Sequence, residues 1–264
     1  DQAASLRKLV ENKKDSAAAD SGTDAAREAP ESSAARPVPK EGARIIAVTS
    51  GKGGVGKSNL TVNLALAFLA EGKKTLVIDA DLGMANVDVL LGTSSKYNLL
   101  HLLEEGVTLD DVILEGPYGL RYISGGSGME QAAEFTPAER AVMEEKLAGC
   151  GAAVDIILVD TGAGIGRNVL DFILAADEVL LVTTPEPTAI TDAYGIIKII
   201  TTEIVEHPVN LKLLVNRAHS ADEGKRISER IITIVSQFLN YKVDYIGFVY
   251  DDPVVQASVI RQKP

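Results

Sequence analysis

Residues 44–58, which read "RIIAVTSGKGGVGKS", constrain the fold of this chain more than any other segment. A β-branched run leads into a glycine-rich loop, residues 51–58, that matches G-x-x-x-x-G-K-[ST], and a helical pattern follows at once. Such a loop wraps backbone N–H groups around phosphate oxygens, and the positive end of the helix dipole strengthens the attraction. The segment therefore predicts a strand, a phosphate-binding loop and a helix, in that order.

The same alternation continues to the end of the chain. Strands are expected at 44–50, 74–81, 120–124, 154–160, 178–184, 210–216 and 242–250, and helices at 57–71, 137–148, 189–207 and 224–240. Several strands are apolar almost throughout, which is typical of strands covered on both faces. We predict an α/β fold with a doubly wound, mostly parallel sheet and helices on both faces, whose ligands bind beyond the carboxyl ends of the strands.

The first 43 residues differ in composition. Residues 12–43 are rich in Ala, Ser, Pro and charge, with Val38 as their one large apolar side chain, so we expect a flexible linker whose ends lie roughly 30 Å apart. It would tether residues 1–11 to a domain at 44–264.

Charge and cysteine content exclude several classes. The net charge is −11 and the pI about 4.8, which argues against broad nucleic-acid binding, although a local basic patch stays possible. The lone cysteine, Cys150, cannot form an internal disulfide or complete a zinc or iron–sulfur site, and we expect a small apolar residue at a helix end. The sequence has no apolar run of membrane-spanning length and no signal peptide, so a cytoplasmic protein is expected.

The glycine-rich loop supplies the candidate nucleotide contacts. Lys57 would contact the β- and γ-phosphates of ATP, and Ser58 would bind Mg²⁺. The loop residues assigned to nucleotide binding are Gly51, Lys52, Gly53, Gly54, Val55, Gly56, Lys57, Ser58 and Asn59.

Three aspartates follow apolar strands. Asp160 is expected to hold Mg²⁺ through water, and the segment after it (Thr161, Gly162, Ala163, Gly164), called switch II, to sense the γ-phosphate. Asp79 and Asp81 alternate onto one side at the end of the strand 74–81. Asp79 is assigned to the metal, and Asp81 to orienting the attacking water as a catalytic residue with Lys52 and Lys57. Aspartates also end strands for structural reasons, which is the competing interpretation.

Lys52 is a second lysine in a loop that already has Lys57. One interpretation is an exposed lysine that adds general attraction for phosphate. The other is that Lys52 points away and neutralises the phosphates bound to a facing subunit, as the arginine finger of a GTPase does in trans.

"KGGVGKS" resembles the deviant Walker A motif of the MinD/ParA class of P-loop ATPases, whose first lysine reaches across an ATP-sandwiched homodimer. By this resemblance Lys52 is the signature lysine, Asp81 the switch I aspartate and Asp160 the start of switch II. "VNRA" implies that Asn216 and Arg217 flank adenine, and "YDDPVVQA" resembles the loop that closes the base pocket, with Asp251 and Pro253. The likeness extends from about residue 44 to residue 260.

Within the class, "DLGMANVDVLLG", "TGAGIGRNVLDFILAADEVLLVTTPEPTAITDAYG" and "DQAASLR" resemble the FlhG family (FleN, YlxH) of flagellar-number regulators. The resemblance implies an ATPase switch that dimerises with ATP, meets flagellar switch-complex (C-ring) proteins and, in some species, a transcription activator. It also implies cycling to the inner face of the cell membrane through a basic amphipathic C-terminal helix. No such segment follows residue 260, so we expect the membrane step in a longer protein and not in this chain.

Other functions stay open. A metabolic phosphotransferase would need an acceptor pocket and a lid, for which we find no sequence. A ParA-like partitioning ATPase would need a basic surface, and a MinD-like division-site regulator normally lacks a long N-terminal extension. A scaffold without activity conflicts with an intact lysine and three carboxylates.

Residues 1–11 have a helical pattern, with Ala3, Leu6 and Val10 on one face, although a frayed tail is the alternative. So short a segment should fold only against a partner. The FlhG resemblance assigns D-Q-A-x-x-L-R to stimulating FlhF, a signal-recognition-particle-type GTPase. Gln2 would order the attacking water or a catalytic loop of the GTPase, Leu6 would anchor the helix, and Arg7 would pair with acidic groups on the GTPase.

Overall fold

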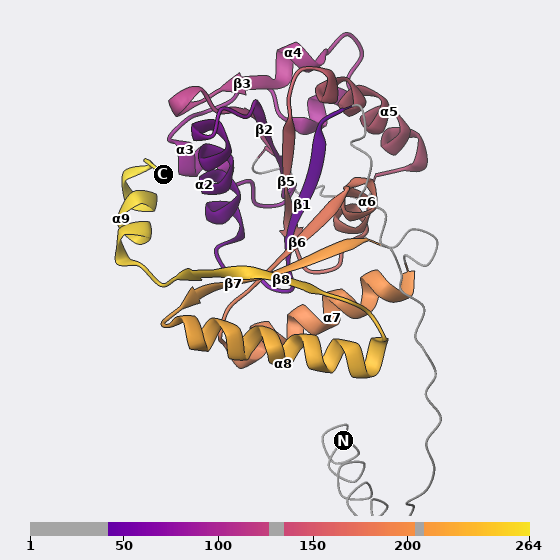
Figure 1. Ribbon diagram of the computed structural model, residues 1–264. Helices are drawn as coiled ribbons and strands as arrows, with labels where there is room; N and C mark the ends of the chain where they lie inside the picture. Colours follow the sequence, from indigo (N-terminus) through magenta and orange to yellow (C-terminus); the bar gives the residue numbers. More distant parts are fainter. Residues whose placement is uncertain (1–41, 127–134, 204–208) are drawn as a thin grey trace, which may run out of the picture. The chain divides into compact units, whose positions relative to one another are not determined.

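The computed structural model describes residues 42–126, 135–203 and 209–264, which belong to a unit that extends from Lys40 to Pro264. The segments 1–11 and 12–41 lie outside the described residues. Within the described part, eight strands form one sheet in the order β3-β4-β2-β5-β1-β6-β7-β8 (Figure 1). All neighbouring strands pair in parallel except β3 and β4 at one edge. The predicted doubly wound, mostly parallel sheet is confirmed.

The elements alternate along the chain as the sequence pattern indicates. The strands are β1 Arg44–Ser50, β2 Thr75–Ala80, β3 Ile113–Glu115, β4 Arg121–Ile123, β5 Ile156–Ala163, β6 Glu178–Thr183, β7 Asn210–Ala218 and β8 Asp244–Tyr250. The α-helices are α2 Lys57–Ala70, α3 Val87–Leu91, α4 Leu109–Val112, α5 Pro137–Ala148, α6 Arg167–Ala175, α7 Pro187–Glu203, α8 Ala221–Leu239 and α9 Pro253–Arg261, and the 3₁₀ turns are η1 Leu99–Leu103, η2 Pro117–Gly119 and η3 Gly149–Ala152.

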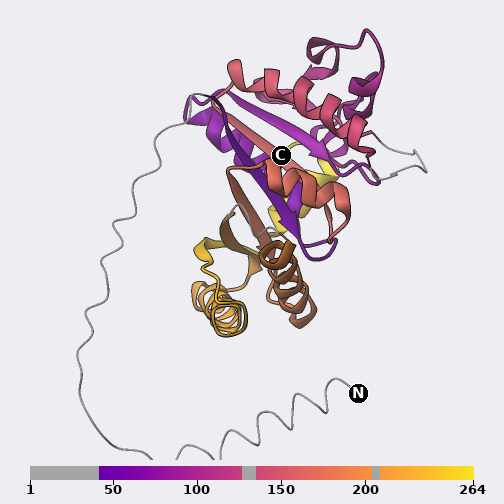
Figure 2. The same cartoon turned by 90° about the vertical axis from the view of Figure 1, so that its right-hand side faces the viewer.

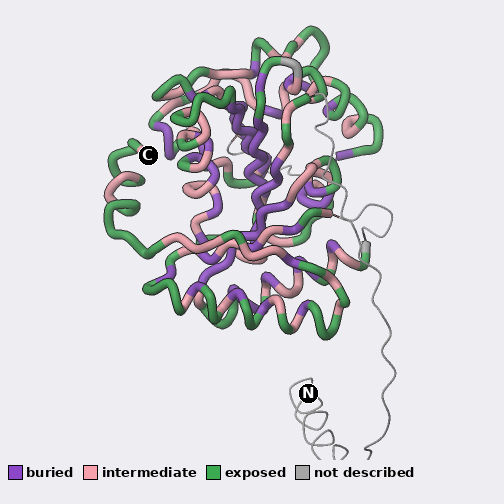
Figure 3. The backbone as a smooth tube through the Cα atoms, viewed as in Figure 1, coloured by how far each residue is buried: buried purple, intermediate pink, exposed green. Residues whose placement is uncertain are grey.

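The alternation of side chains along the central strands fills hydrophobic cores on both faces of the sheet. In β1, Ile46 and Val48 pack with α2 and α3 on one face, and Ala47 between them packs with α6 and α7 on the other. Side chains on both faces of the central strands are therefore buried, and Figure 3 shows these central strands as the most continuously buried part of the unit. Figure 2 shows α7 and α8 side by side below the sheet.

The start of helix α8 differs from the prediction for a local reason. Helix α8 begins at Ala221 and not at residue 224, because the Ser220 side chain accepts a hydrogen bond from the Glu223 N–H and caps the helix. Gly224 lies inside the first turn, where a Cβ would come within 2.8 Å of Phe248 Cβ on β8. The glycine marks close helix–strand packing and not a helix start. Strand β3 and the helices α3, α4, α6 and α9 were not among the predicted elements.

Candidate active site

The glycine-rich loop leaves the carboxyl end of β1, near the middle of the sheet, and ends at α2. Gly54 and Gly56 have φ values of 80° and 88°, which side chains other than glycine adopt only at a cost. Gly51 is required for a second reason, because a Cβ there would lie 2.4 Å from the backbone carbonyl carbon of Asp192 on α7. The loop is thus shaped by backbone constraints at both of its ends.

Lys57 and Asp160 form a buried ion pair at the first turn of α2. The Lys57 Nζ donates to Asp160 Oδ1 at 2.7 Å, and the side chains are 7% and 0% exposed. Thr61, one turn further along α2, donates its hydroxyl to the same oxygen at 3.2 Å. The other oxygen, Oδ2, is buried and has no hydrogen-bond partner within the described residues. The carboxylate thus keeps one free acceptor beside the loop.

The oxygen atoms beside the loop that could bind a metal fit a magnesium ion bound together with a nucleotide. The hydroxyl-bearing Ser58 lines the cavity beside the loop, and the unpaired Oδ2 of Asp160 is the kind of hard oxygen that Mg²⁺ prefers. Within the described residues, no group of three His, Cys, Asp or Glu side chains could hold a metal by itself. This pattern suits Mg²⁺, which commonly takes only one or two protein ligands plus phosphate oxygens and water.

Asp79 and Asp81 have different surroundings. Asp79 is fully buried, and it accepts hydrogen bonds from the N–H groups of Asp81, Asn86 and Val87 at 3.1, 2.9 and 3.0 Å. Burial, and secondly the charge of Asp160, raise the pKa of Asp79 to about 7. A nearby Mg²⁺ would lower this pKa again. Asp79 thus holds both ends of the segment 81–87, with one N–H donor on Oδ1 and two on Oδ2.

Asp81 lies just past the end of β2 and lines the cavity next to the glycine-rich loop. Its Oδ1 accepts from the Met84 N–H at 3.1 Å. The two aspartates that alternation places together are therefore separated by burial, with Asp79 inside the domain and Asp81 at the cavity.

Switch II differs from the flexible loop that the glycines suggest. Strand β5 continues through Asp160 to Ala163, because Thr161 donates its hydroxyl to the Val48 carbonyl at 3.1 Å and Gly164 N–H donates to the Ser50 carbonyl at 2.9 Å. Gly162 and Ala163 line the cavity. The segment is tied to β1, with a register shift between the pairs Val48–Asp160 and Ser50–Ala163, and it is followed by Gly164, whose φ is 92°.

Lys52 is held by the start of α7. Its Nζ pairs with the Glu186 carboxylate and donates to Thr188 Oγ1 at 3.0 Å. The hydrogen bond and charge of Lys52 keep the pKa of Glu186 below its ordinary value. Lys52 is therefore directed away from Lys57 and Asp160, as one of its two interpretations requires, and is engaged within its own chain.

The base side of the site is a second cavity of about 430 Å³, next to the phosphate-side cavity of about 570 Å³. Gly56 and Asn59 line both cavities, so together they form one continuous surface for a nucleotide. Asn216 and Arg217 line the base side at a register shift in β7, where Arg217 has a φ of 57°. Asp251 also lines it.

Several contacts refine the predicted base pocket. Asn216 Nδ2 donates to the Val55 carbonyl at 2.8 Å, so this side chain also supports the glycine-rich loop. Arg217 Nε pairs with Asp251 Oδ1 at 3.3 Å. Pro253 is the first residue of α9 and does not line the cavity, whereas the preceding Asp252 lines it and caps the helix.

Sequence reasoning missed Thr61, Glu186 and Thr188. Thr61 could have been found, because it lies four residues after Lys57 on one helix face. Glu186 and Thr188 follow β6, and only the strand order, with β6 beside β1, brings them to Lys52.

Cys150 is buried in η3 as expected, and burial raises the pKa of its thiol to about 11.

Gln2, Leu6 and Arg7 lie outside the described residues. Among those that the structure does describe, no helix has the length and apolar character needed to cross a membrane.

Comparison with known proteins shows which family this chain resembles in sequence and in fold. The profile of a family described as an AAA domain matches residues 43–214. The antiactivator FleN of Pseudomonas aeruginosa is 40% identical over 83% of this chain and 78% of its own length, and the flagellum site-determining protein YlxH of Helicobacter pylori is 38% identical over 85% and 75%. Among solved structures, the MinD cell division protein of Aquifex aeolicus shares 30% identity at a TM-score of 0.67, covering 84% of this chain and 88% of that one. MinD of Pyrococcus horikoshii complexed with Mg-ADP shares 25% at 0.68, covering 84% and 87%.

Proposed function

The chain belongs to the FlhG (FleN/YlxH) family of MinD/ParA-class P-loop ATPases, and from this membership we propose that it is a nucleotide-controlled switch that regulates the number and placement of flagella. It is an ATPase. The observation that carries the proposal is a cavity lined by Lys57, Ser58 and Asp81, with Asp160 paired to Lys57, in a chain whose relatives are a flagellar site-determining protein and an antiactivator.

ATP would occupy the two joined cavities, with its base near Asn216 and Arg217 and its phosphates at the loop. Mg²⁺ would be held by Ser58 and Asp160, and it would neutralise charge on the β- and γ-phosphates. Asp79, whose oxygens accept three backbone N–H groups, would position the segment that carries Asp81 and would not ligate the metal directly. Asp81 would orient the attacking water.

Lys52 is the residue that would connect ATP hydrolysis to the formation of a homodimer. It can leave Glu186 and Thr188 at little cost, because an ion pair this exposed contributes little to stability. The γ-phosphate of a second subunit would offer a stronger, multiply charged partner. We therefore propose an ATP-dependent homodimer in which each Lys52 contacts the nucleotide bound by the other subunit.

The dimer can be tested by size-exclusion chromatography with Mg²⁺ and a slowly hydrolysed ATP analogue. A dimer is expected with the analogue and a monomer with ADP. Lys52→Ala should bind nucleotide normally, stay monomeric and lose most of its hydrolysis. Glu186→Ala is the matched control, since it breaks the same intrachain pair and keeps the lysine, and it should still dimerise. A Lys52→Ala protein that dimerises like the parent would contradict the role in trans.

The N-terminal segment is proposed to stimulate FlhF. A peptide of residues 1–11 is expected to raise GTP hydrolysis by FlhF, Gln2→Ala to remove most of the stimulation, and Leu6→Ala to weaken binding, because Leu6 lies on the apolar face. Ser5→Ala serves as the control peptide and should act like the parent. Deleting residues 1–11 should leave ATP turnover unchanged. A severalfold change in ATP turnover, with FlhF unaffected, would make the segment an internal regulator instead.

The remaining partners follow from family membership. Flagellar switch-complex (C-ring) proteins and a flagellar transcription activator are proposed, as is cycling between the cytoplasm and the inner face of the membrane through a C-terminal helix. A MinD-like or ParA-like role is the alternative. Binding of random duplex DNA that weakens with salt would favour the ParA-like role, whereas the net charge of −11 favours no nucleic-acid partner.

A further inference from the structure

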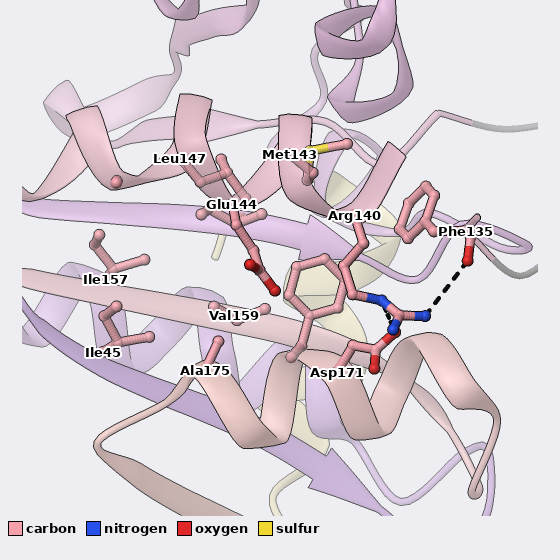
Figure 4. Close-up of a pocket in the computed structure, with 13 residues that line it drawn as sticks. Ile45, Phe135, Arg140, Met143, Glu144, Leu147, Ile157, Val159, Asp171 and Ala175 are labelled. Carbon is pink, nitrogen blue, oxygen red and sulfur yellow. Dashed lines mark hydrogen bonds and ion pairs between the residues drawn. The ribbon is translucent and has the colours of Figure 1, made fainter. Parts of the chain in front are cut away.

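A cavity of about 240 Å³ lies between α5, α6 and the sheet, on the face opposite α2. Its walls are apolar. Ile78, Ile157 and Val159 form the side made by the sheet, and Met143, Leu147 and Phe172 come from the two helices (Figure 4). The cavity is separate from the nucleotide site, because the two sets of lining residues do not overlap.

Polar contacts hold α5 and α6 together at one end of this cavity. Arg140 Nε on α5 pairs with Asp171 Oδ2 on α6 at 2.8 Å, and its Nη2 donates to the Phe135 carbonyl at 3.4 Å. The Phe135 N–H donates to Asn168 Oδ1 on α6 at 3.1 Å. The guanidinium of Arg140 is thus already engaged (Figure 4).

Glu144 is the charged group that is not engaged. Its side chain extends from α5 into the space between the two helices (Figure 4). Within the described residues it forms no hydrogen bond or ion pair. The cavity therefore combines apolar walls with one carboxylate that is free to receive a cation.

We propose that this α5–α6 cavity is a docking site for a partner protein, which inserts one aromatic or large aliphatic side chain and pairs an adjacent Arg or Lys with Glu144. The volume supports a single side chain. It is smaller than the roughly 300–1,000 Å³ of most small-molecule pockets and larger than the roughly 150 Å³ that encloses benzene. A buried apolar anchor is also the usual form of an interface hot spot. The chain's net charge of −11 favours a basic partner segment.

The position of α6 connects this site to the ATPase. Helix α6 begins at Arg167, three residues after switch II ends at Gly164. Gly162 lies between α6 and Asp81, since a Cβ there would be 3.6 Å from Val169 Cγ2 and 3.7 Å from Asp81 Oδ1. A side chain inserted beside Phe172 and Ala175 would shift α6 against Gly162. Docking is therefore coupled to the nucleotide site through α6.

The natural distribution of methionines allows a direct test. Met143 lines the docking cavity, and Met84 lines the phosphate-side cavity, while Met129 is outside the described residues. With ¹³C-methyl-methionine in the whole chain, N-acetyl-Phe-Arg-amide is added as the probe. We expect a saturable shift of the Met143 methyl signal in the millimolar range, and a smaller Met84 shift with the same half-saturation concentration. N-acetyl-Phe-Glu-amide, which presents the same ring with the opposite charge, should bind more weakly.

Variants separate docking from nonspecific binding. Glu144→Lys should weaken binding of the N-acetyl-Phe-Arg-amide probe by about fivefold. Glu145→Lys makes the same charge change at the next residue, which does not line the cavity, and should leave the affinity for the probe unchanged. Ala175→Phe fills the cavity from within and should abolish the probe-dependent shift of the Met143 signal, and a cooperative thermal unfolding transition shows that this variant is folded. No Met143 shift, or equal shifts with both dipeptides, overturns the docking site. A Met143 shift without a Met84 shift overturns the coupling to the switch.

Discussion

Replacing Lys57 with alanine is expected to abolish measurable Mg–ATP binding and also to lower the melting temperature of the nucleotide-free protein by about 10 °C. The first effect follows from the loss of the main cation at the phosphates, where each charge-assisted hydrogen bond is worth about 1.5–3 kcal/mol. The second follows from the ion pair, because Asp160 is 0% exposed and would keep a buried charge without a cation. Breaking such a pair costs about 3–5 kcal/mol, and 1 kcal/mol shifts the melting temperature of a domain of this size by about 2–4 °C.

A double variant separates the two effects. Asp160→Asn in the Lys57→Ala background removes the orphaned charge with little change in volume, so the melting temperature should recover while Mg–ATP binding, measured by titration calorimetry, stays absent. If Lys57→Ala alone melts like the parent, then the ion pair does not stabilise the free domain. If the double variant binds Mg–ATP, the assignment of Lys57 to the phosphates is wrong.

Asp81→Ala is expected to reduce ATP turnover by about 10²–10⁴-fold, the usual contribution of a positioned acid or base. ATP should still bind, because Asp81 lies at the edge of the phosphate-side cavity and has no contact with Lys57 or Asp160 among the described interactions. With hydrolysis blocked, the proposed dimer should persist after excess ATP is removed. The measurements are phosphate release and the decay of the dimer on size-exclusion chromatography.

Asp81→Asn distinguishes chemistry from loop structure. The amide oxygen of asparagine can still accept from the Met84 N–H, which Asp81 Oδ1 accepts at 3.1 Å, but the charge that orients water is lost. If the carboxylate acts on water, then the Asp81→Asn protein should hydrolyse ATP nearly as slowly as the Asp81→Ala protein. Normal turnover in Asp81→Asn, with slow turnover in Asp81→Ala, would show that Asp81 shapes the loop only.

The nucleotide loop could be predicted from the sequence because its constraints are local. Gly54 and Gly56 are needed for positive φ, and Lys57 and Ser58 follow them by a fixed spacing at the start of a helix. The strand β1 was predicted to the residue, since an apolar run bounded by the loop leaves no other interpretation. Helix α8 was placed three residues too late, because the Ser220 cap was overlooked and Gly224 was given the meaning of a helix boundary.

The ion-pair partners of Lys57 and Lys52 could not be predicted from the sequence. Lys57 and Asp160 are separated by 103 positions, and Lys52 and Glu186 by 134. These contacts depend on the strand order β2-β5-β1-β6, which places the carboxyl ends of β5 and β6 on either side of the loop after β1. The same order buries Asp79 and leaves Asp81 at the cavity, although the two residues alternate alike along the chain.

The sequence by itself therefore determined the fold class and the glycine-rich loop, because each depends on periodicity or spacing within a few residues, whereas the roles of Asp79, Asp81 and Asp160 stay predictions. Only the tertiary structure decided which partners the charged groups have: Lys57 pairs with Asp160, Lys52 pairs with Glu186, and Asp79 accepts hydrogen bonds from the segment that follows Asp81. The physical reason is that burial and ion pairing act through space, and the sheet brings together side chains that the sequence places far apart.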